Sequence, residues 1–578
     1  MSRSGSAGPS GGIAYKWIAL SNTTLGALMA FMNQTIVMIA LPTIFAGLHV
    51  NPLAKGQTTL LLWVLLGYNV ATTVLLVTFG RISDSYGKVR FYNLGFVVFT
   101  VGSLLCALTP GVATTGALEL VAFRMVQGVG GAFLMANSAA ILTDAFPPNQ
   151  RGLALGVNMV VGIAGGIVGL VLGGLLAAIN WRLVFLVSVP VGVIGTLWAY
   201  FQLKDSGSSR AHGFDPWGNL TFGLGLLALV VGLTYSLIPF GGQSMGWGNP
   251  MVWLLIGAGV ILLALFAVIE YRVRSPMFQI RLFKIRAFAA GNLAGFIASL
   301  GRGGLQFMLV IWLQGVWLPL HGVSFRDTPL QAGIDTMPMM IGFIGAGPVS
   351  GVLSDRFGSR LFAAAGMVVS ALGFVLLSLL PPDFSYPPFA ASLLVVGAGM
   401  GLFAAPNTAS IMSSVPAQYR GVASGMRATF VNAGMLMSMA VFFTVVLSGL
   451  SVRLPRALET GLSGAGLPSQ LVHQVASLPA SAALFAALLG YSPLAHLLPP
   501  AVLSRLPHAA AARVVSPRFF AGLISAPMAD GLRLVFWSGA AMSLVAAVAS
   551  AIPRERLSAA DPKSSGADPR SDTGDAAS

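Results

Sequence analysis

A few ionisable side chains interrupt long apolar stretches of this sequence, and they are the residues best placed to do chemistry. A charged group inside a membrane span costs roughly 3 kcal/mol or more, so each one requires a reason. An arginine there can bind an anion or change the proton affinity of a neighbouring acid, and a carboxyl group can bind and release a proton. These residues are Arg124, Arg302, Arg427, Glu119 and Asp335.

The three arginines leave different alternatives open. Arg124 lies near the middle of its apolar run, as the centre of a hydrogen-bond network or as a participant in substrate binding or proton coupling. Arg302, in 299-SLGRGGLQ-306, fits a structural and a binding role equally well. Arg427 lies nearer one end of its run, where its long side chain can reach the membrane surface.

No arrangement typical of an enzyme is present. None of the six histidines lies in the middle of an apolar run, and no two are spaced as a ligand pair. The sequence contains no nucleophile–base set and no phosphate-binding loop, and its single cysteine, Cys106, excludes an intramolecular disulfide and a cysteine metal cluster. We therefore expect no catalytic residue, no metal and no cofactor.

Composition identifies the elements that must position these groups. The chain has 578 residues, of which 56% are hydrophobic and only 8% are charged, whereas soluble domains carry about 25% charged residues. Apolar runs of the roughly 20 residues needed to cross a bilayer recur along the chain. We predict an all-α membrane protein with fourteen transmembrane helices, near 17–46, 58–79, 91–110, 115–143, 152–179, 182–203, 216–239, 251–271, 288–319, 330–354, 361–380, 388–412, 421–450 and 532–552.

Basic residues predict the orientation. If the N-terminus is cytoplasmic, 20 of the 32 Lys and Arg lie in cytoplasmic tails and loops, and the short outer loops hold only Lys55, Arg182 and Arg326. This is the bias expected of a multi-pass protein with both ends in the cytoplasm. The net charge of +15 is thus explained by topology, and nucleic-acid binding is not expected.

Two segments recur at one offset and indicate an internal duplication. The loop 80-GRISDSYGKVR-90 returns as 351-GVLSDRFGSR-360, and 136-ANSAAILTDAFPPNQRG-152 returns as 406-PNTASIMSSVPAQYRG-421, each about 270 residues later. The duplication predicts two six-helix bundles with two extra helices between them. The expected parts are an N-terminal tail (1–16), a first bundle (17–203), two extra helices with a basic connector (204–287), a second bundle (288–552) that includes an outer loop (451–531), and a disordered cytoplasmic tail (553–578).

Two connecting segments have less certain roles. The connector 272–288 alternates basic and apolar residues, as an interfacial segment or a contact for anionic lipids. Within the outer loop, 482-AALFAALLG-490 is too short to span a membrane, and we expect an amphipathic or re-entrant cap over the outer mouth. The sequence does not decide whether this cap is a lid.

The repeated glycine-bracketed loop resembles a known signature. Its glycines allow a sharp turn between close helices, and its aspartate can interact with a helix N-terminus or a basic partner. The chain resembles the major facilitator superfamily of transporters, in particular its fourteen-span drug:proton antiporter branch. Further matches are 124-RMVQGVGGA-132 in the fourth span and 32-MNQTIVMIALP-42 in the first. The signature positions are Gly80, Asp84, Gly87, Lys88 and Arg90, with Asp355, Arg356, Gly358 and Arg360 in the weaker copy, where Gly351 also matches.

The resemblance implies two bundles that rock about a central cavity, with the signature loops as a latch on the cytoplasmic side while the cavity faces outward. The fifth span carries 162-GIAGGIVGLVLGG-174, which resembles the antiporter signature G-x-x-x-G-P-x-x-G-G but has Leu170 in place of its proline. The groove formed by Gly165, Gly169, Gly173 and Gly174 can still pack against another helix, or act only in ordinary packing, while the kink expected from proline is in doubt.

The first span departs from the branch at the residue that matters most for protons. Asn33 replaces its usual aspartate, so we expect Asp335 or Glu119 to carry the proton, with Arg124 adjusting the affinity. A compatible hypothesis is a net positive cavity that favours anionic or zwitterionic amphiphiles over cationic dyes. The expected cavity residues are Asn33, Gln34, Gln127, Arg302, Gln306 and Asn407.

The sequence thus predicts a monomeric efflux transporter in the bacterial cytoplasmic membrane. It would export amphipathic small molecules, driven by the proton gradient, in contact with protons and membrane lipids. A lipid or metabolite carrier of the same fold, and a non-transporting membrane sensor, remain alternatives.

Overall fold

The computed structural model describes residues 15–51, 57–147, 150–205, 215–236, 238–241, 245–273, 276, 278–416, 419–465, 467–498, 504 and 507–552. Within these ranges, thirteen helices or broken helices are long and apolar enough to cross a membrane, and α2 adds the apolar segment Leu60–Leu76. Each of the fourteen predicted spans falls on one of these, so the predicted fold class is confirmed. The predicted tails lie almost wholly outside the described residues.

The first half of the chain forms seven helices and the second half a longer series. The elements of the first half and the middle are α1 (Tyr15–Gly47), α2 (Gln57–Tyr86), α3 (Lys88–Ala107), α4 (Ala113–Ala145), α5 (Arg151–Ile179), α6 (Leu183–Leu186), α7 (Ser188–Gln202), α8 (Pro216–Tyr235), η1 (Gly246–Gly248), α9 (Pro250–Arg272) and η2 (Ile280–Lys284). Those of the second half are α10 (Arg286–Trp312), η3 (Leu313–Trp317), α11 (Leu318–Leu320), α12 (Thr328–Asp335), α13 (Met337–Phe357), α14 (Ser359–Ser378), α15 (Tyr386–Ser414), α16 (Arg420–Gly464), α17 (Ser469–Ala476), α18 (Ala480–Leu488), α19 (Pro493–Leu497), α21 (His508–Val515) and α22 (Pro517–Ala551).

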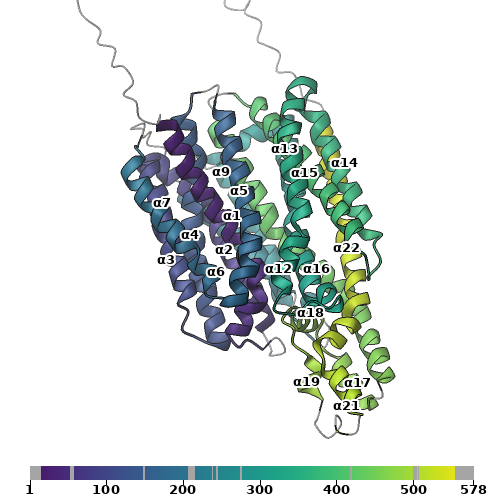
Figure 1. Ribbon diagram of the computed structural model, residues 1–578. Coiled ribbons are helices and arrows are strands. Elements are labelled where there is room, and N and C mark those ends of the chain that lie inside the picture. The colour runs from purple at the N-terminus through teal and green to yellow at the C-terminus, as the bar shows by residue number, and fades with distance from the viewer. Residues whose placement is uncertain are drawn as a thin grey trace, which may run out of the picture.

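Helices are the required solution here, because a helix satisfies its own backbone hydrogen bonds where no water is available. They form two bundles, one of α1 to α7 and one of α10 to α16 with α22, and α8 packs against α9 (Figure 1). The start of α1 and the end of α22 lie at one end, which we call the termini end. Helices α17, α19 and α21 lie at the opposite end, which we call the loop end (Figure 1).

The predicted outer loop is mostly helical in its described part. Helix α16 continues to Gly464 and α22 begins at Pro517, so both extend well beyond the predicted spans 421–450 and 532–552. Between them, α17 and α18 meet at an angle of 88°. Each is too short to cross a bilayer, so the pair turns back at the loop end.

The first bundle depends on the glycine groove of α5. A Cβ atom placed on Gly165 would lie 2.5 Å from the backbone oxygen of Leu28, and one on Gly173 would lie 2.9 Å from that of Ile36. At Gly169 it would overlap Thr35 Oγ1 and approach the Met32 oxygen to 2.5 Å. These contacts recur every four residues along α1, so the groove is the surface on which α1 and α5 meet backbone to backbone.

Leu170, which stands where the resemblance expects proline, has a different neighbour. Helix α5 continues through this position, and Leu170 is fully buried. A Cβ atom on Gly333 of α12 would lie 3.0 Å from the Leu170 oxygen, and Gly174 is similarly close to Leu330. The groove therefore faces α1, while the adjacent face of the same helix packs against the second bundle.

We predict that Gly169→Ala destabilises the protein by about 1–3 kcal/mol, because the added methyl group would force two backbones apart. The matched control is Gly156→Ala on the same helix, where a Cβ atom would meet no atom within 4 Å. Thermal unfolding in detergent would compare the two variants. Equal midpoints for Gly169→Ala and wild type would contradict the packing described here.

Candidate functional site

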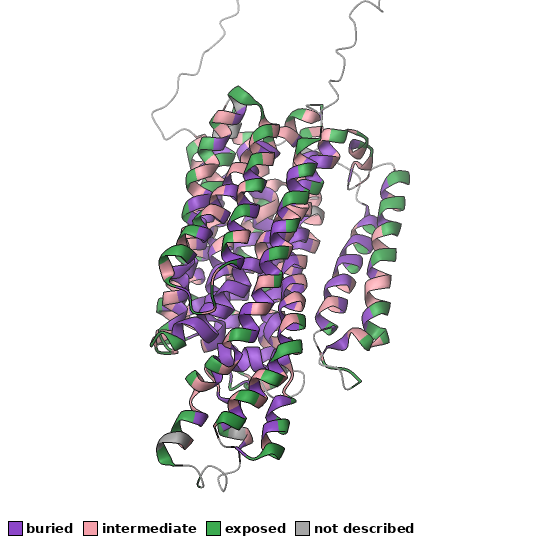
Figure 2. Ribbon diagram, turned by 90° about the vertical axis from the view of Figure 1, so that its right-hand side faces the viewer, coloured by how far each residue is buried: buried purple, intermediate pink, exposed green. Residues whose placement is uncertain are grey.

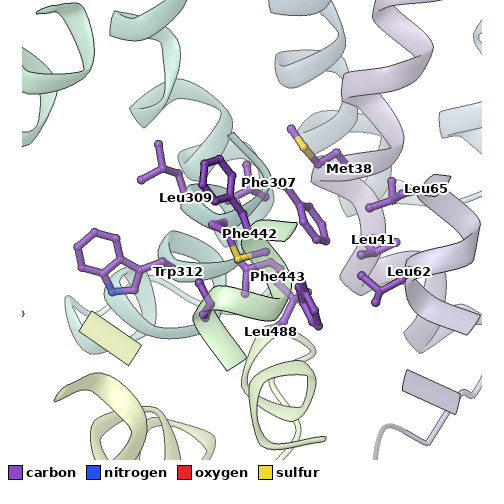
Figure 3. Close-up of a cluster of buried hydrophobic side chains, with 14 of the residues drawn as sticks. Met38, Leu41, Leu62, Leu65, Phe307, Leu309, Trp312, Phe442, Phe443 and Leu488 are labelled. Atoms are coloured by element: carbon purple, nitrogen blue, oxygen red, sulfur yellow. The ribbon is translucent and has the colours of Figure 1, made fainter. Parts of the chain in front are cut away.

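Contacts between the two bundles concentrate toward the loop end. Gln314 donates to the Ile39 oxygen at 3.2 Å, and Arg326 donates to the Ala178 oxygen at 3.2 Å. Between them lies an apolar cluster, in which residues of α1 and α2 point toward residues of the second bundle (Figure 3). This loop-end seal contains Met38, Leu41, Leu62 and Leu65 on one side and Phe307, Phe442, Phe443 and Leu488 on the other.

Helix α18 belongs to this seal. All nine residues of Ala480–Leu488 are buried. The ring of Phe485 lies 5.4 Å from that of Phe443 on α16, and the Leu488 backbone lies against Gly315 of η3. The segment expected as an amphipathic or re-entrant cap is thus an apolar plug inserted among the ends of the transmembrane helices.

Toward the termini end the helices are less buried. On α5, Leu155, Met159 and Val160 are exposed, and they lie on more than one helix face, although the same helix is mostly buried beyond Gly162. On α13, Val349 and Val352 are exposed as well. Figure 2 shows the same contrast, with buried residues gathered toward the loop end. The bundles therefore close on each other at the loop end and expose helix surface at the termini end.

A cavity lies between the bundles, with about 440 Å³ of atom-free space. Its wall is half polar and half apolar, and both bundles contribute to it. The amide nitrogen of Gln34 donates to Asn69 Oδ1 at 2.9 Å and lies 3.9 Å from the sulfur of Met435 on α16. The lining residues are Ala30, Phe31, Gln34, Tyr68, Asn69, Thr72, Thr73, Met135, Asn432, Met435 and Leu436.

Arg124 lies behind this wall, in a network within the first bundle. Its guanidinium is 1% exposed, donates to the Val64 oxygen at 3.1 Å and to Gln127 Oε1 at 2.5 Å, and stacks 4.7 Å from the Tyr68 ring centre. Gln127 in turn donates to Ser103 Oγ at 2.7 Å. Neither Arg124 nor Gln127 is among the residues that line the cavity, and Tyr68 carries the contact from this network to the cavity wall.

Asn33 sits beside the network as a buried amide. It is 0% exposed, and neither its nitrogen nor its oxygen has a hydrogen-bond partner among the described residues. The Tyr68 hydroxyl group also lacks one there. Buried polar groups are normally paired, so these atoms can bond with a bound water molecule or a ligand.

The second bundle presents two cations that lack such a network. Arg302 stacks 4.6 Å from the Phe343 ring centre and makes no hydrogen bond or ion pair with another described residue. The Nε atom of Arg427 and the Nε2 atom of Gln306 are buried without a partner in the described chain. Asn407 is already used, because it donates to the Gly291 oxygen at 3.1 Å near the termini end.

The two acidic candidates have different surroundings. Asp335 is 4% exposed at the end of α12 and accepts a hydrogen bond from Gln331 at 2.9 Å. Glu119 accepts from the backbone nitrogen of Gly111 at 2.9 Å and so holds the loop before its own helix. On α4, Glu119 lies 16 residues from cavity-lining Met135, about 24 Å along the axis. The structure therefore separates Glu119 from the cavity.

The signature loops are tight turns at the termini end. Gly87 and Gly358 have φ angles of 111° and 93°, which favour glycine. Lys88 pairs with Asp144 at 2.8 Å, and the backbone nitrogen of Val89 donates to Asp205 at 2.9 Å. These described bonds stay within the first bundle or its following segment.

The rest of the signature is only partly described. Arg81 donates to the Pro276 oxygen of the connector, and Arg360 donates to the Ala551 oxygen. The side chains of Asp84 and Asp355 lie outside the described residues, so their predicted role as latches stays a prediction.

Sequence reasoning missed part of the site. Tyr68, Asn69 and Thr72 line the cavity, and they were detectable as polar residues one helical turn apart inside an apolar run. Asp144 and Asp205, which bond to the loop at Gly87, had no signal beyond the position of Asp144 in the second repeated segment.

A two-bundle helical protein with a shared central cavity, closed at one end, defines a membrane carrier. The family model of the Major Facilitator Superfamily matches residues 23–439, and the chain belongs to that superfamily. Its duplicated halves agree with this assignment.

Curated relatives are transporters. The chain is 30% identical over 432 residues to a riboflavin transporter of Clostridioides difficile, covering 74% of this chain and 87% of the relative. It is 26% identical over 540 residues to a multidrug transporter of Bacillus subtilis (92% of each chain). It is 29% identical over 434 residues to the tetracenomycin C resistance and export protein of Streptomyces glaucescens (75% and 76%). These relatives indicate a transport role with small-molecule substrates.

A solved structure shares the fold. It is a bacterial homologue of the human lysosomal transporter Spinster, with a TM-score of 0.55, 17% identity, and coverage of 93% of this chain and 98% of that one. The protein is thus a multi-pass membrane transporter.

We predict that a disulfide between Leu170→Cys and Gly333→Cys stops transport. A Cβ atom on Gly333 lies 3.5 Å from the Leu170 Cβ atom, within the range of disulfides of about 3.5–4.5 Å, and the bond would hold the loop end closed. Replacing the single cysteine, Cys106, by serine gives a clean background. Oxidation should abolish transport and reduction restore it, while each single-cysteine variant stays active. Undiminished transport with both thiols protected from maleimide would contradict a moving loop-end seal.

Proposed function

We propose that this protein is a secondary-active exporter of amphipathic small molecules, working by alternating access in exchange for protons in a bacterial cytoplasmic membrane. The observation that carries the proposal is the cavity lined by both bundles and sealed at the loop end. Its wall combines amides and hydroxyl groups with Phe31, Met135, Met435 and Leu436, which suits a ligand with a polar and an apolar part. The drug-exporting relatives support the direction of transport.

The distribution of basic residues places the termini end in the cytoplasm. The described conformation is then an inward-facing one, in which the cavity can be loaded from the cytoplasm or the inner leaflet. Export requires the loop-end seal, with the α18 plug, to open while the termini end closes. The Lys88–Asp144 pair and the turns at Gly87 and Gly358 lie where that closure occurs. We expect a monomer that needs only substrate, protons and surrounding lipid.

A second candidate is a carrier of an endogenous metabolite. The riboflavin transporter, at 30% identity, is the observation that favours it. Riboflavin also combines a flat ring system with a polar chain, so the same wall could accommodate either class.

The test is accumulation of cationic, neutral and anionic dyes and of riboflavin in an efflux-deficient bacterial host. Cells with the protein should accumulate less of at least one dye than cells with empty vector. Dissipating the proton gradient with nigericin and valinomycin should remove the difference. Riboflavin alone responding would favour the metabolite carrier, and no response to any probe would favour a membrane sensor.

Proton coupling makes a separate prediction about the two acids. We expect Asp335→Asn to abolish gradient-driven export and Glu119→Gln to retain most of it. Asp335 lies on α12, which packs against α5 of the other bundle, so its surroundings change when the bundles move. Glu119 has a structural hydrogen bond that glutamine can also accept. Both substitutions preserve shape and remove one ionisable group, which makes them a matched pair in a proteoliposome assay.

Full export by Asp335→Asn and by the double variant would exclude both acids as proton carriers. Loss of export in Glu119→Gln alone would reverse their assignment.

A further inference from the structure

The second bundle holds a cation whose charge no described residue compensates. Arg302 lies on α10, and the five N–H donors of its guanidinium face only the Phe343 ring, 4.6 Å away, among the described residues. Described ion pairs of the chain involve Lys88, His321, His473, Arg453 and Arg533, and not Arg302. Arg124, at a comparable depth of the first bundle, has backbone and amide acceptors instead.

The position of Arg302 connects it with the central cavity. Gly303, the next residue, lies against the backbone of Met435, and Met435 lines the cavity. A Cβ atom on Gly301, the preceding residue, would meet no atom within 4 Å, so there is open space beside the guanidinium. Arg302 is thus at the depth of the cavity and next to unfilled volume.

A second donor lies one helical turn away. Gln306 follows Arg302 by four residues, on the same face of α10. It is 7% exposed, and its Nε2 atom has no acceptor in the described chain. Arg427, five residues before cavity-lining Asn432, adds another cation about 7.5 Å toward the termini end along α16. Its Nε atom is likewise buried without a partner there.

The acids that could have neutralised these cations have other bonds. Asp335 accepts from Gln331, and Glu119 accepts from Gly111. Glu270 accepts from the backbone of Phe278, and Asp215 caps α8 through Gly218. The excess of donors and positive charge therefore belongs to the cavity region itself.

We propose that Arg302 and Gln306 form the subsite that binds the carboxylate of an aromatic organic anion carried by this transporter. The guanidinium fork can hold both carboxylate oxygens, the Gln306 amide can donate a third hydrogen bond, and Phe343 supports the guanidinium from the other side. The ring of the ligand would occupy the space near Gly301 and Met435. This assignment rests on the proposed transport function and specifies its substrate class.

The experiment compares two dyes with the same xanthene core, anionic fluorescein and cationic rhodamine 123. Binding to purified protein in neutral detergent is measured by fluorescence anisotropy, which requires neither transport nor a proton gradient. Wild type should bind fluorescein, and Arg302→Gln should weaken that binding about tenfold or more while leaving rhodamine 123 unchanged or improved. Arg302→Lys, which keeps the charge but not the fork, should fall between them.

The control is Arg326→Gln, the same charge change at the loop end. Because Arg302 has no protein acceptor, its removal leaves no described group unpaired, and unfolding midpoints check that the variants are folded. Unchanged fluorescein binding in Arg302→Gln, or no fluorescein binding by wild type, would overturn the subsite. Displacement of fluorescein by phosphatidylglycerol at low mole fraction would overturn the substrate assignment in favour of a lipid headgroup.

Transport in proteoliposomes then separates the two proposals. Arg302-dependent fluorescein binding without gradient-driven movement would leave the subsite standing and contradict the exporter. Gradient-driven movement of rhodamine 123 alone would do the reverse.

Discussion

The cost of placing charge among apolar side chains is the constraint on which the rest of this structure depends. The first bundle meets it internally, since Arg124 bonds with Val64 and Gln127 and stacks on Tyr68. Buried networks that are fully satisfied are rigid, so this half offers the cavity a fixed wall. The second bundle leaves the same requirement open at Arg302, and an unsatisfied cation beside free volume is a site for a ligand.

Close helix packing determines which surfaces remain for motion. The groove of Gly165, Gly169 and Gly173 brings α1 and α5 together over their backbones, which removes that face of α5 from any rearrangement. The neighbouring face, with Leu170 and Gly174, is the one that meets α12. One helix thus belongs firmly to its own bundle and, through a different face, forms a contact that separates in an alternating-access cycle. A leucine in place of proline is compatible with this division, because α5 is continuous at that point.

The loop end adds a feature of this chain to the shared architecture. The plug α18 is as buried as the transmembrane core and contacts α16 and η3 of the second bundle. Its burial means that opening of this end exposes apolar surface, at a free-energy cost of about 25 cal/mol for each Å². That cost favours the closed loop end, so the described conformation is the one in which the apolar seal is complete.

Much of this protein was decided by the sequence alone. Fourteen apolar runs, the repeat at about 270 residues and the glycine-bracketed loops predict the helical spans and the superfamily, because burying a backbone in lipid leaves only helices and apolar side chains as solutions. The sequence also singled out Gln34 and Arg302, since polar groups in such runs are rare. Only the tertiary structure decided which of these groups satisfy one another. Arg124 and Gln127 proved to be paired inside one bundle, Glu119 was tied to its own loop, and Tyr68, Asn69 and Thr72 were brought to the cavity wall. The physical reason is that pairing depends on distances between helices far apart in sequence, whereas the cost of burial is a property of each residue by itself.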